Sequence, residues 1–177
     1  MPAPDPIQLA NDTWHLCQTL LSPGLSSTLK TAPRDPQPFK KGGTNIVRLR
    51  ILPQKKVPAR FWDNTWCFYE LGVGSYDNSA LVLGGVAFLQ FSDQQVCGDG
   101  LHQSAVRQIL EHAHRQRAND FQLGDSSGGG ATMPFLGRRY RANPAQKFFP
   151  VELAANDLAW LINVTLPEFQ KLPPARG

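Results

Sequence analysis

Nine basic residues and a single acidic one lie between residues 30 and 60, which gives this segment a charge of +8. Aromatic residues lie within it or directly after it, at positions 39, 61, 62 and 66. Lysine and arginine pair with phosphates, and each aromatic ring that stacks on an unpaired base contributes roughly 1–3 kcal/mol to binding. Every neutralised phosphate also releases counterions, so affinity should fall steeply with salt. The segment therefore predicts a surface for single-stranded nucleic acid.

A second basic group surrounds Tyr140 and follows a glycine-rich segment at residues 124–130. Backbone N–H groups of such a loop can wrap a phosphate, although this loop lacks the spacing and the lysine of a Walker motif. A mobile connector is the alternative, and the sequence does not decide whether residues 128–130 bind anything. Taken from both basic groups, the predicted nucleic-acid-binding residues are Lys40, Lys41, Arg48, Arg50, Lys55, Lys56, Arg60, Phe61, Trp62, Trp66, Arg138, Arg139 and Arg141.

The opposing interpretation is that the basic strand is only the solvated side of a half-exposed sheet. In that case Arg48 and Arg50 face water, and Trp62 and Trp66 belong to the core. The total charge does not reveal that basic and acidic residues are concentrated in different segments, because 18 Lys and Arg against 14 Asp and Glu leave only +4. Residues 61–100 carry five acidic residues and no basic one, so a segment of −5 directly follows the segment of +8.

A strand must present these charges, and residues 44–52 have the alternation of one. Hydrophobic residues at 47, 49 and 51 share one face, while Arg48 and Arg50 share the other with Ile46 and Leu52. Residues 60–73 predict a strand or a hairpin with a tight turn at Asp63 and Asn64, and residues 80–91 predict a further strand, with Gly84 and Gly85 indicating a bulge or a close backbone approach. Together these strands predict an antiparallel meander, with closure into a barrel as one option.

Hydrophobic residues at helical spacing predict helices at 7–21, 101–117 and 151–164, the first capped by Asp5. Thr165 and Glu168 resemble a capping box that starts a short closing helix ending near residue 172. Residues 22–43 read as a linker and 118–145 as loop-rich. The predicted fold is a single α+β domain, residues 1–177. It comprises an N-terminal helix (1–21), a linker (22–43) and a core (44–172) whose sheet is packed by two or three helices.

The run from Lys41 to Pro53, KGGTNIVRLRILP, resembles the strand that opens the core of phage-type single-stranded DNA-binding proteins. That family tends to show a Gly-x-Asn-x-Val-Arg run that closes with Leu-Pro and is followed by aromatic residues. The resemblance covers about a tenth of the chain and implies an OB-like barrel with a basic, aromatic groove. The chain lacks the family's zinc-binding cysteine cluster, and the helix at 101–117 has no obvious place in a minimal barrel.

Two other groups of residues were considered for chemistry. The segment containing Ser126 and Ser127 is similar to the Gly-Asp-Ser-Gly-Gly of trypsin-like proteases, but the extra serine disturbs the turn that builds an oxyanion hole. The required base would be His15, which lies in a predicted helix. The spacing of Cys97, His102, His112 and His114 matches no common zinc site. We therefore expect no catalytic residue, no metal and no cofactor.

These observations favour a non-catalytic nucleic-acid-binding protein that acts through the basic strand and its aromatic neighbours. One rival is an assembly or interaction subunit that docks on a protein partner through its N-terminal helix, residues 1–21. Another is a hydrolase that uses the Ser126/Ser127 loop. No secretory signal or membrane-spanning stretch is recognised, and the three cysteines make a poor disulfide framework, so a cytoplasmic location without membrane contact is expected.

Overall fold

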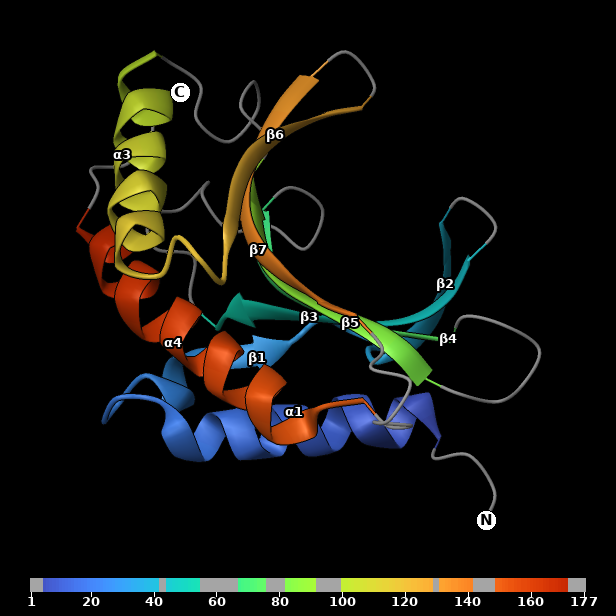
Figure 1. The fold of residues 1–177 in the computed structure, drawn as a ribbon. Helices are drawn as coiled ribbons and strands as arrows, with labels where there is room; N and C mark the ends of the chain where they lie inside the picture. The colour runs from blue at the N-terminus through green and yellow to red at the C-terminus, as the bar shows by residue number, and fades with distance from the viewer. Residues whose placement is uncertain are drawn as a thin grey trace.

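The computed structural model describes residues 5–41, 44–54, 67–75, 82–91, 100–128, 131–141 and 149–171. In these ranges the chain forms three α-helices and seven strands of one antiparallel sheet, so the fold is α+β as predicted (Figure 1). The helices are α1 (Pro6–Leu20), α3 (Gly100–Gln116) and α4 (Val151–Gln170). The strands are β1 (Leu29–Thr31), β2 (Gln37–Lys41), β3 (Thr44–Pro53), β4 (Cys67–Ser75), β5 (Val82–Phe91), β6 (Gln122–Gly128) and β7 (Ala131–Arg141).

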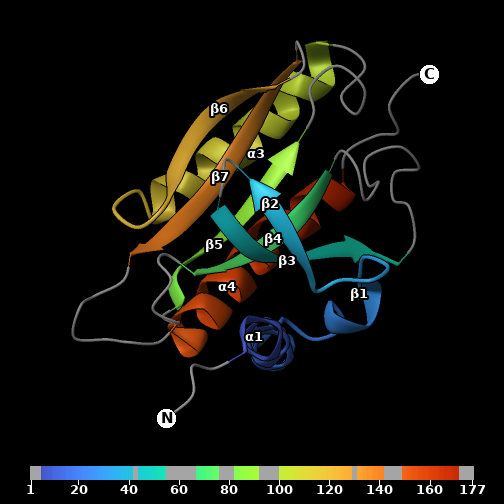
Figure 2. The same ribbon diagram turned by 90° about the vertical axis from the view of Figure 1, so that its right-hand side faces the viewer.

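The strand order is β1-β3-β4-β5-β7-β6, and β2 pairs with β3 along the same edge as β1. The predicted meander is present, because β3, β4 and β5 are successive in the chain and adjacent in the sheet. The sheet is strongly curved but does not close into a barrel, since β1 and β2 lie at one edge and β6 at the other (Figure 2).

All three helices pack on the same face of the sheet. The predicted alternation of β3 is confirmed, because Val47, Leu49 and Ile51 are buried in the main core. Their partners in register, Val73, Leu71 and Tyr69, continue this face on β4, and buried residues of every α-helix join the same core. Figures 1 and 2 show the helices on the convex side of the sheet and the concave side turned away from them.

Helix α1 begins at the predicted cap, where the carboxylate of Asp5 accepts a hydrogen bond from the backbone N–H of Ile7. Its buried residues, among them Trp14 and Cys17, face β3, β4 and α4. The helix therefore contributes to the core of the domain. No helix in the described ranges is long and apolar enough to cross a membrane.

The predicted break near Thr165 is absent, because α4 runs without interruption to Gln170 and includes Pro167. The Thr165 hydroxyl donates to the carbonyl of Leu161 at 2.6 Å and pairs with the Tyr69 hydroxyl at 2.8 Å, so it does not cap a new helix. Leu166 and Phe169 continue the buried stripe. Their burial keeps the chain helical across a proline that would otherwise favour a stop.

Two segments expected to lack regular structure contribute strands. Within residues 22–43 the chain forms β1 and β2, which are short because residues 32–36 interrupt the edge between them. Within residues 118–145 it forms the β6–β7 hairpin, whose register is regular over seven residue pairs. β6 is rich in glycine and serine, so its own sequence does not favour a strand. Its pairing with β7 stabilises the strand.

Cys17 provides a test of the core around α1. Burial raises the pKa of its thiol from 9.0 to about 12, so at pH 8 almost none of it is the reactive thiolate. We expect iodoacetamide to leave Cys17 unmodified in the folded protein and to modify it fully in 6 M guanidinium chloride, as read by peptide mass spectrometry. Rapid modification at pH 8 without denaturant would contradict this packing of α1.

Candidate nucleic-acid interface

The face of the sheet opposite the helices gathers several of the predicted basic positions. We call it the helix-free face, since no described helix packs on it. Residues that pair directly across neighbouring strands lie on the same face of the sheet. The register therefore places positions 41, 48, 50, 139 and 141 on this face. Residues 40 and 138 occupy the other face, because successive residues of a strand alternate. The acidic positions that accompany the cations are Glu70 and, from the neighbouring edge loop, Asp35.

Arg50 holds the loop that interrupts the sheet edge. Thr31 lies opposite Ile51 and Gln37 opposite Arg48, so five residues (32–36) oppose only two of β3 (49 and 50). The Asp35 carboxylate accepts from the backbone N–H of Arg50 at 2.7 Å and from its Nε at 2.9 Å. This hydrogen bonding raises the pKa of Arg50, and Asp35 replaces a strand partner at this position.

Arg48 pairs with an acidic residue of the neighbouring strand. Its Nε donates to Oε2 of Glu70 at 2.6 Å, and the two side chains are 19% and 15% exposed. Arg48 is therefore a half-buried, ion-paired side chain, whereas both sequence-based interpretations placed it on an exposed surface.

Arg139 lies across the sheet from Arg48 and is exposed. The register connects them through Gly72 of β4 and Val86 of β5, so they are separated by three interstrand steps. At about 4.8 Å per step the separation along the sheet is about 14 Å. No ion pair joins Arg139 to any residue in the described part of the chain.

Phe135 adds an aromatic ring to the helix-free face. It lies opposite Gly124 in the β6–β7 register and is half-buried. A Cβ atom at position 124 would lie 2.9 Å from the ring, so the ring packs directly on the glycine backbone. Sequence reasoning had placed residues 133–136 in a loop-rich region and missed this residue.

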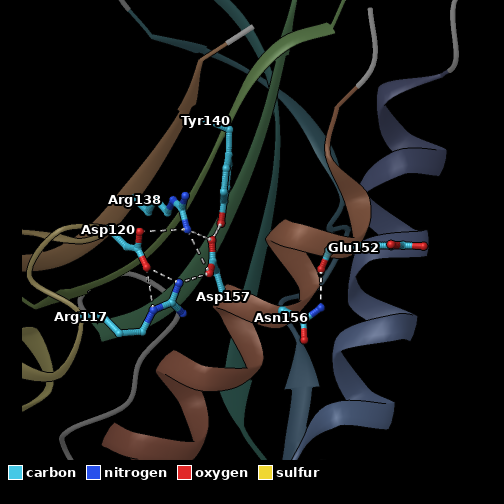
Figure 3. Close-up of polar contacts among 7 residues, drawn as sticks. All are labelled: Arg117, Asp120, Arg138, Tyr140, Glu152, Asn156 and Asp157. Atoms are coloured by element: carbon cyan, nitrogen blue, oxygen red, sulfur yellow. Dashed lines mark hydrogen bonds and ion pairs between the residues drawn. The ribbon is translucent and has the colours of Figure 1, made fainter. Parts of the chain in front are cut away.

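Arg138, adjacent to Arg139, faces the helices and takes part in a buried polar network (Figure 3). The centre of the network is Asp157 of α4, whose side chain is 1% exposed. Its carboxylate accepts from Arg117 at 2.8 Å, from Arg138 at 3.1 Å and from the Tyr140 hydroxyl at 2.7 Å. Burial, and then the charge of Asp157, raise the pKa of Tyr140 above its ordinary value. This network joins α4 to β7, so Arg138 is occupied in holding the domain together.

Arg117 extends the network toward the surface. It donates to Asp120 at 2.8 Å, and this bond holds the pKa of that carboxyl below its ordinary value. Its guanidinium also lies 5.0 Å from the ring centroids of Phe121 and Trp160. The arrangement satisfies a buried carboxylate with cations and a hydroxyl, which is the condition for such burial.

The remaining predicted residues divide into two groups. Lys55, Lys56, Arg60, Phe61, Trp62 and Trp66 lie outside the described residues. Ser126 and Ser127 lie within β6, opposite Met133 and Thr132 in a regular antiparallel register, and His15 is exposed on α1. That placement gives the serines no sharp turn of the kind that presents a nucleophile.

Besides Phe135, two acidic residues that the sequence-based prediction left out of the site are important to it. Asp35 organises the edge loop, and it is the single acidic residue among the nine basic ones of residues 30–60. A lone acidic residue among so many basic ones could have indicated the role of Asp35 from the sequence. Nothing in the sequence indicates the role of Glu70, because its pairing with Arg48 depends on the β3–β4 register.

Within the described ranges, no group of three or more His, Cys, Asp and Glu side chains is placed to hold a metal ion. A surface groove of about 560 Å³ lies between α3 and α4, with Ile109, His112, Val164 and Lys171 among its lining residues.

No protein-family model matches the chain, and no curated protein or solved structure matches it either.

Proposed function

We propose that the protein binds nucleic acid on the helix-free face of its sheet. The observation that carries the proposal is the register, which brings cationic positions from β2, β3 and β7 to one face although they are up to 100 residues apart in the chain. Among the described residues, six cationic positions (30, 41, 48, 50, 139 and 141) meet two acidic ones there, so these positions keep a positive excess of four. A positive face of this kind attracts a phosphate backbone.

A single strand is the proposed ligand. The cations at 48 and 139 are about 14 Å apart along a concave sheet, so a backbone that contacts both must cross β4 and β5. Phe135 offers a ring on the same face for stacking with an unpaired base. Phe61, Trp62 and Trp66 remain proposed stacking residues.

The resemblance to phage-type single-stranded DNA-binding proteins supports the same proposal. Residues 44–53 of its motif form β3, where Arg48 and Arg50 share the helix-free face. The open sheet differs from the closed barrel that the resemblance implies. The proposal therefore rests on the basic face and takes the family likeness as secondary support.

Titration of the protein with labelled oligonucleotides at several salt concentrations tests the proposal. We expect single-stranded DNA or RNA to bind more tightly than duplex, with log affinity falling linearly against log salt concentration. Absence of binding at low salt, or an affinity indifferent to salt, would refute it. Arg139→Ala should reduce the salt slope by about 0.7, the value for one phosphate of a single strand.

Arg115→Ala is the matched control for that variant. Arg115 is also exposed, and its loss changes the net charge equally, but it lies on α3 on the helix side of the sheet. We expect the control to leave the salt slope nearly unchanged. Equal effects of the two substitutions would show that binding follows total charge and not the helix-free face.

A further inference from the structure

Residues 32–35 form a tight turn at the interrupted sheet edge. The backbone N–H of Asp35 donates to the carbonyl of Ala32 at 3.1 Å, which closes a four-residue turn. Pro33 is its second residue, and Arg34, its third, has a φ of 69°. Proline at the second position and a positive φ at the third are the features of a type II turn, where glycine is the preferred third residue.

Hydrogen bonds of the Asp35 side chain hold the turn in place. The Asp35 side chain is fully buried (0% exposed), and besides the bonds to Arg50 described above it accepts from Gln37 Nε2 at 3.0 Å. A second guanidinium nitrogen of Arg50 donates to its other oxygen at 3.0 Å. These bonds fix the position of residue 34, because it is the immediate neighbour of Asp35.

Arg34 occupies the least suitable position of this turn for a residue with a side chain. A positive φ brings Cβ close to the backbone, and glycine avoids that conflict. Arg34 is exposed, and no ion pair joins it to any residue in the described part of the chain. Neither burial nor an ion pair of the Arg34 side chain among those residues therefore accounts for an arginine at this position, and strained positions of this kind tend to occur at functional sites.

We propose that Arg34 is a phosphate-binding residue of the nucleic-acid interface, presented by a preorganised turn; this inference rests on the function proposed above. The turn borders the helix-free face, because Asp35 bonds the Arg50 side chain that lies on it. Lys30 of β1 is also exposed on this edge. A rigid turn lowers the entropy lost when its arginine engages a phosphate. The interface then extends from Arg139 to the sheet edge at Arg34.

The test uses Arg34→Gly and Arg34→Ala in the full chain, each measured for urea unfolding and for oligonucleotide binding. Both remove the charge, but only glycine relieves the turn. We expect Arg34→Gly to raise the urea midpoint above that of the natural protein and of Arg34→Ala. Both variants should bind single strands several-fold more weakly, with a salt slope smaller by about 0.7. Arg34→Lys should retain the slope.

The outcomes separate this inference from the proposed function. If the natural protein binds with a steep salt slope but both variants bind with the same slope, Arg34 is no phosphate contact and the function still stands. If the natural protein does not bind at low salt, the proposed function itself fails. A lower urea midpoint for Arg34→Gly than for Arg34→Ala would overturn the turn geometry.

Discussion

Asp157→Ala is expected to lower the free energy of unfolding by about 3 kcal/mol. Removing one partner of a buried ion pair costs about 3–5 kcal/mol, because the other charge stays without compensation. We expect the lower end, since Arg117 and Arg138 keep 25% and 23% of their side chains exposed. The Tyr140 hydroxyl, which is buried, also loses its acceptor. Urea unfolding followed by circular dichroism measures the change.

Asn156→Ala provides the matched control on the preceding position of α4. Its side chain is exposed and, among the described residues, donates only to the carbonyl of Glu152 within the same helix (Figure 3). We expect a change within about 0.5 kcal/mol, as is usual for surface substitutions. Equal, small effects of both variants would show that the network around Asp157 contributes nothing to stability.

Trp14→Ala should destabilise the domain by about 3–5 kcal/mol, the usual cost of removing a large aromatic side chain from a core. Trp14 is 6% exposed and packs in the main core. His15→Ala, at the exposed neighbouring position, should change the unfolding free energy by less than about 0.5 kcal/mol. Thermal and urea unfolding of both variants measure the difference.

This pair of variants also distinguishes the proposed role of α1 from the rival one. If α1 serves mainly to dock on a protein partner, Trp14→Ala should leave the domain as stable as the natural protein while a complex is lost. If α1 is part of the core, the same change should destabilise the isolated domain. The packing of Trp14 and Cys17 favours the second outcome.

The elements with strong periodicity were predictable from the sequence. The alternation around Arg48 and Arg50 identified β3 and both of its faces, and the spacing of hydrophobic residues identified α1 and α3 to within a residue or two of their ends. These patterns are local, so they need no knowledge of what the element packs against. The hairpin of β6 and β7 was not predictable in this way, because its edge strand is rich in glycine and serine.

The composition of the candidate site depends on register, which the sequence does not display. Arg138 and Arg139 are identical neighbours in the chain, yet one binds Asp157 among the helices and the other lies exposed on the opposite face. A shift of one residue would exchange their roles. Counting charges along the sequence therefore identified the basic groups. It could not tell which of their residues lie on the helix-free face and which pair with acidic residues on the helix side.

Helix α4 completes the surroundings of α1. Asn163 of α4 accepts from the backbone N–H of Ser22 and donates to the carbonyl of Leu20, partners that lie 141 and 143 residues away. Synthesis proceeds from the N-terminus, so α1 leaves the ribosome long before α4 exists. Contacts this distant in sequence also slow folding. The apolar side of α1 therefore lacks its packing against α4 until α4 has been synthesised.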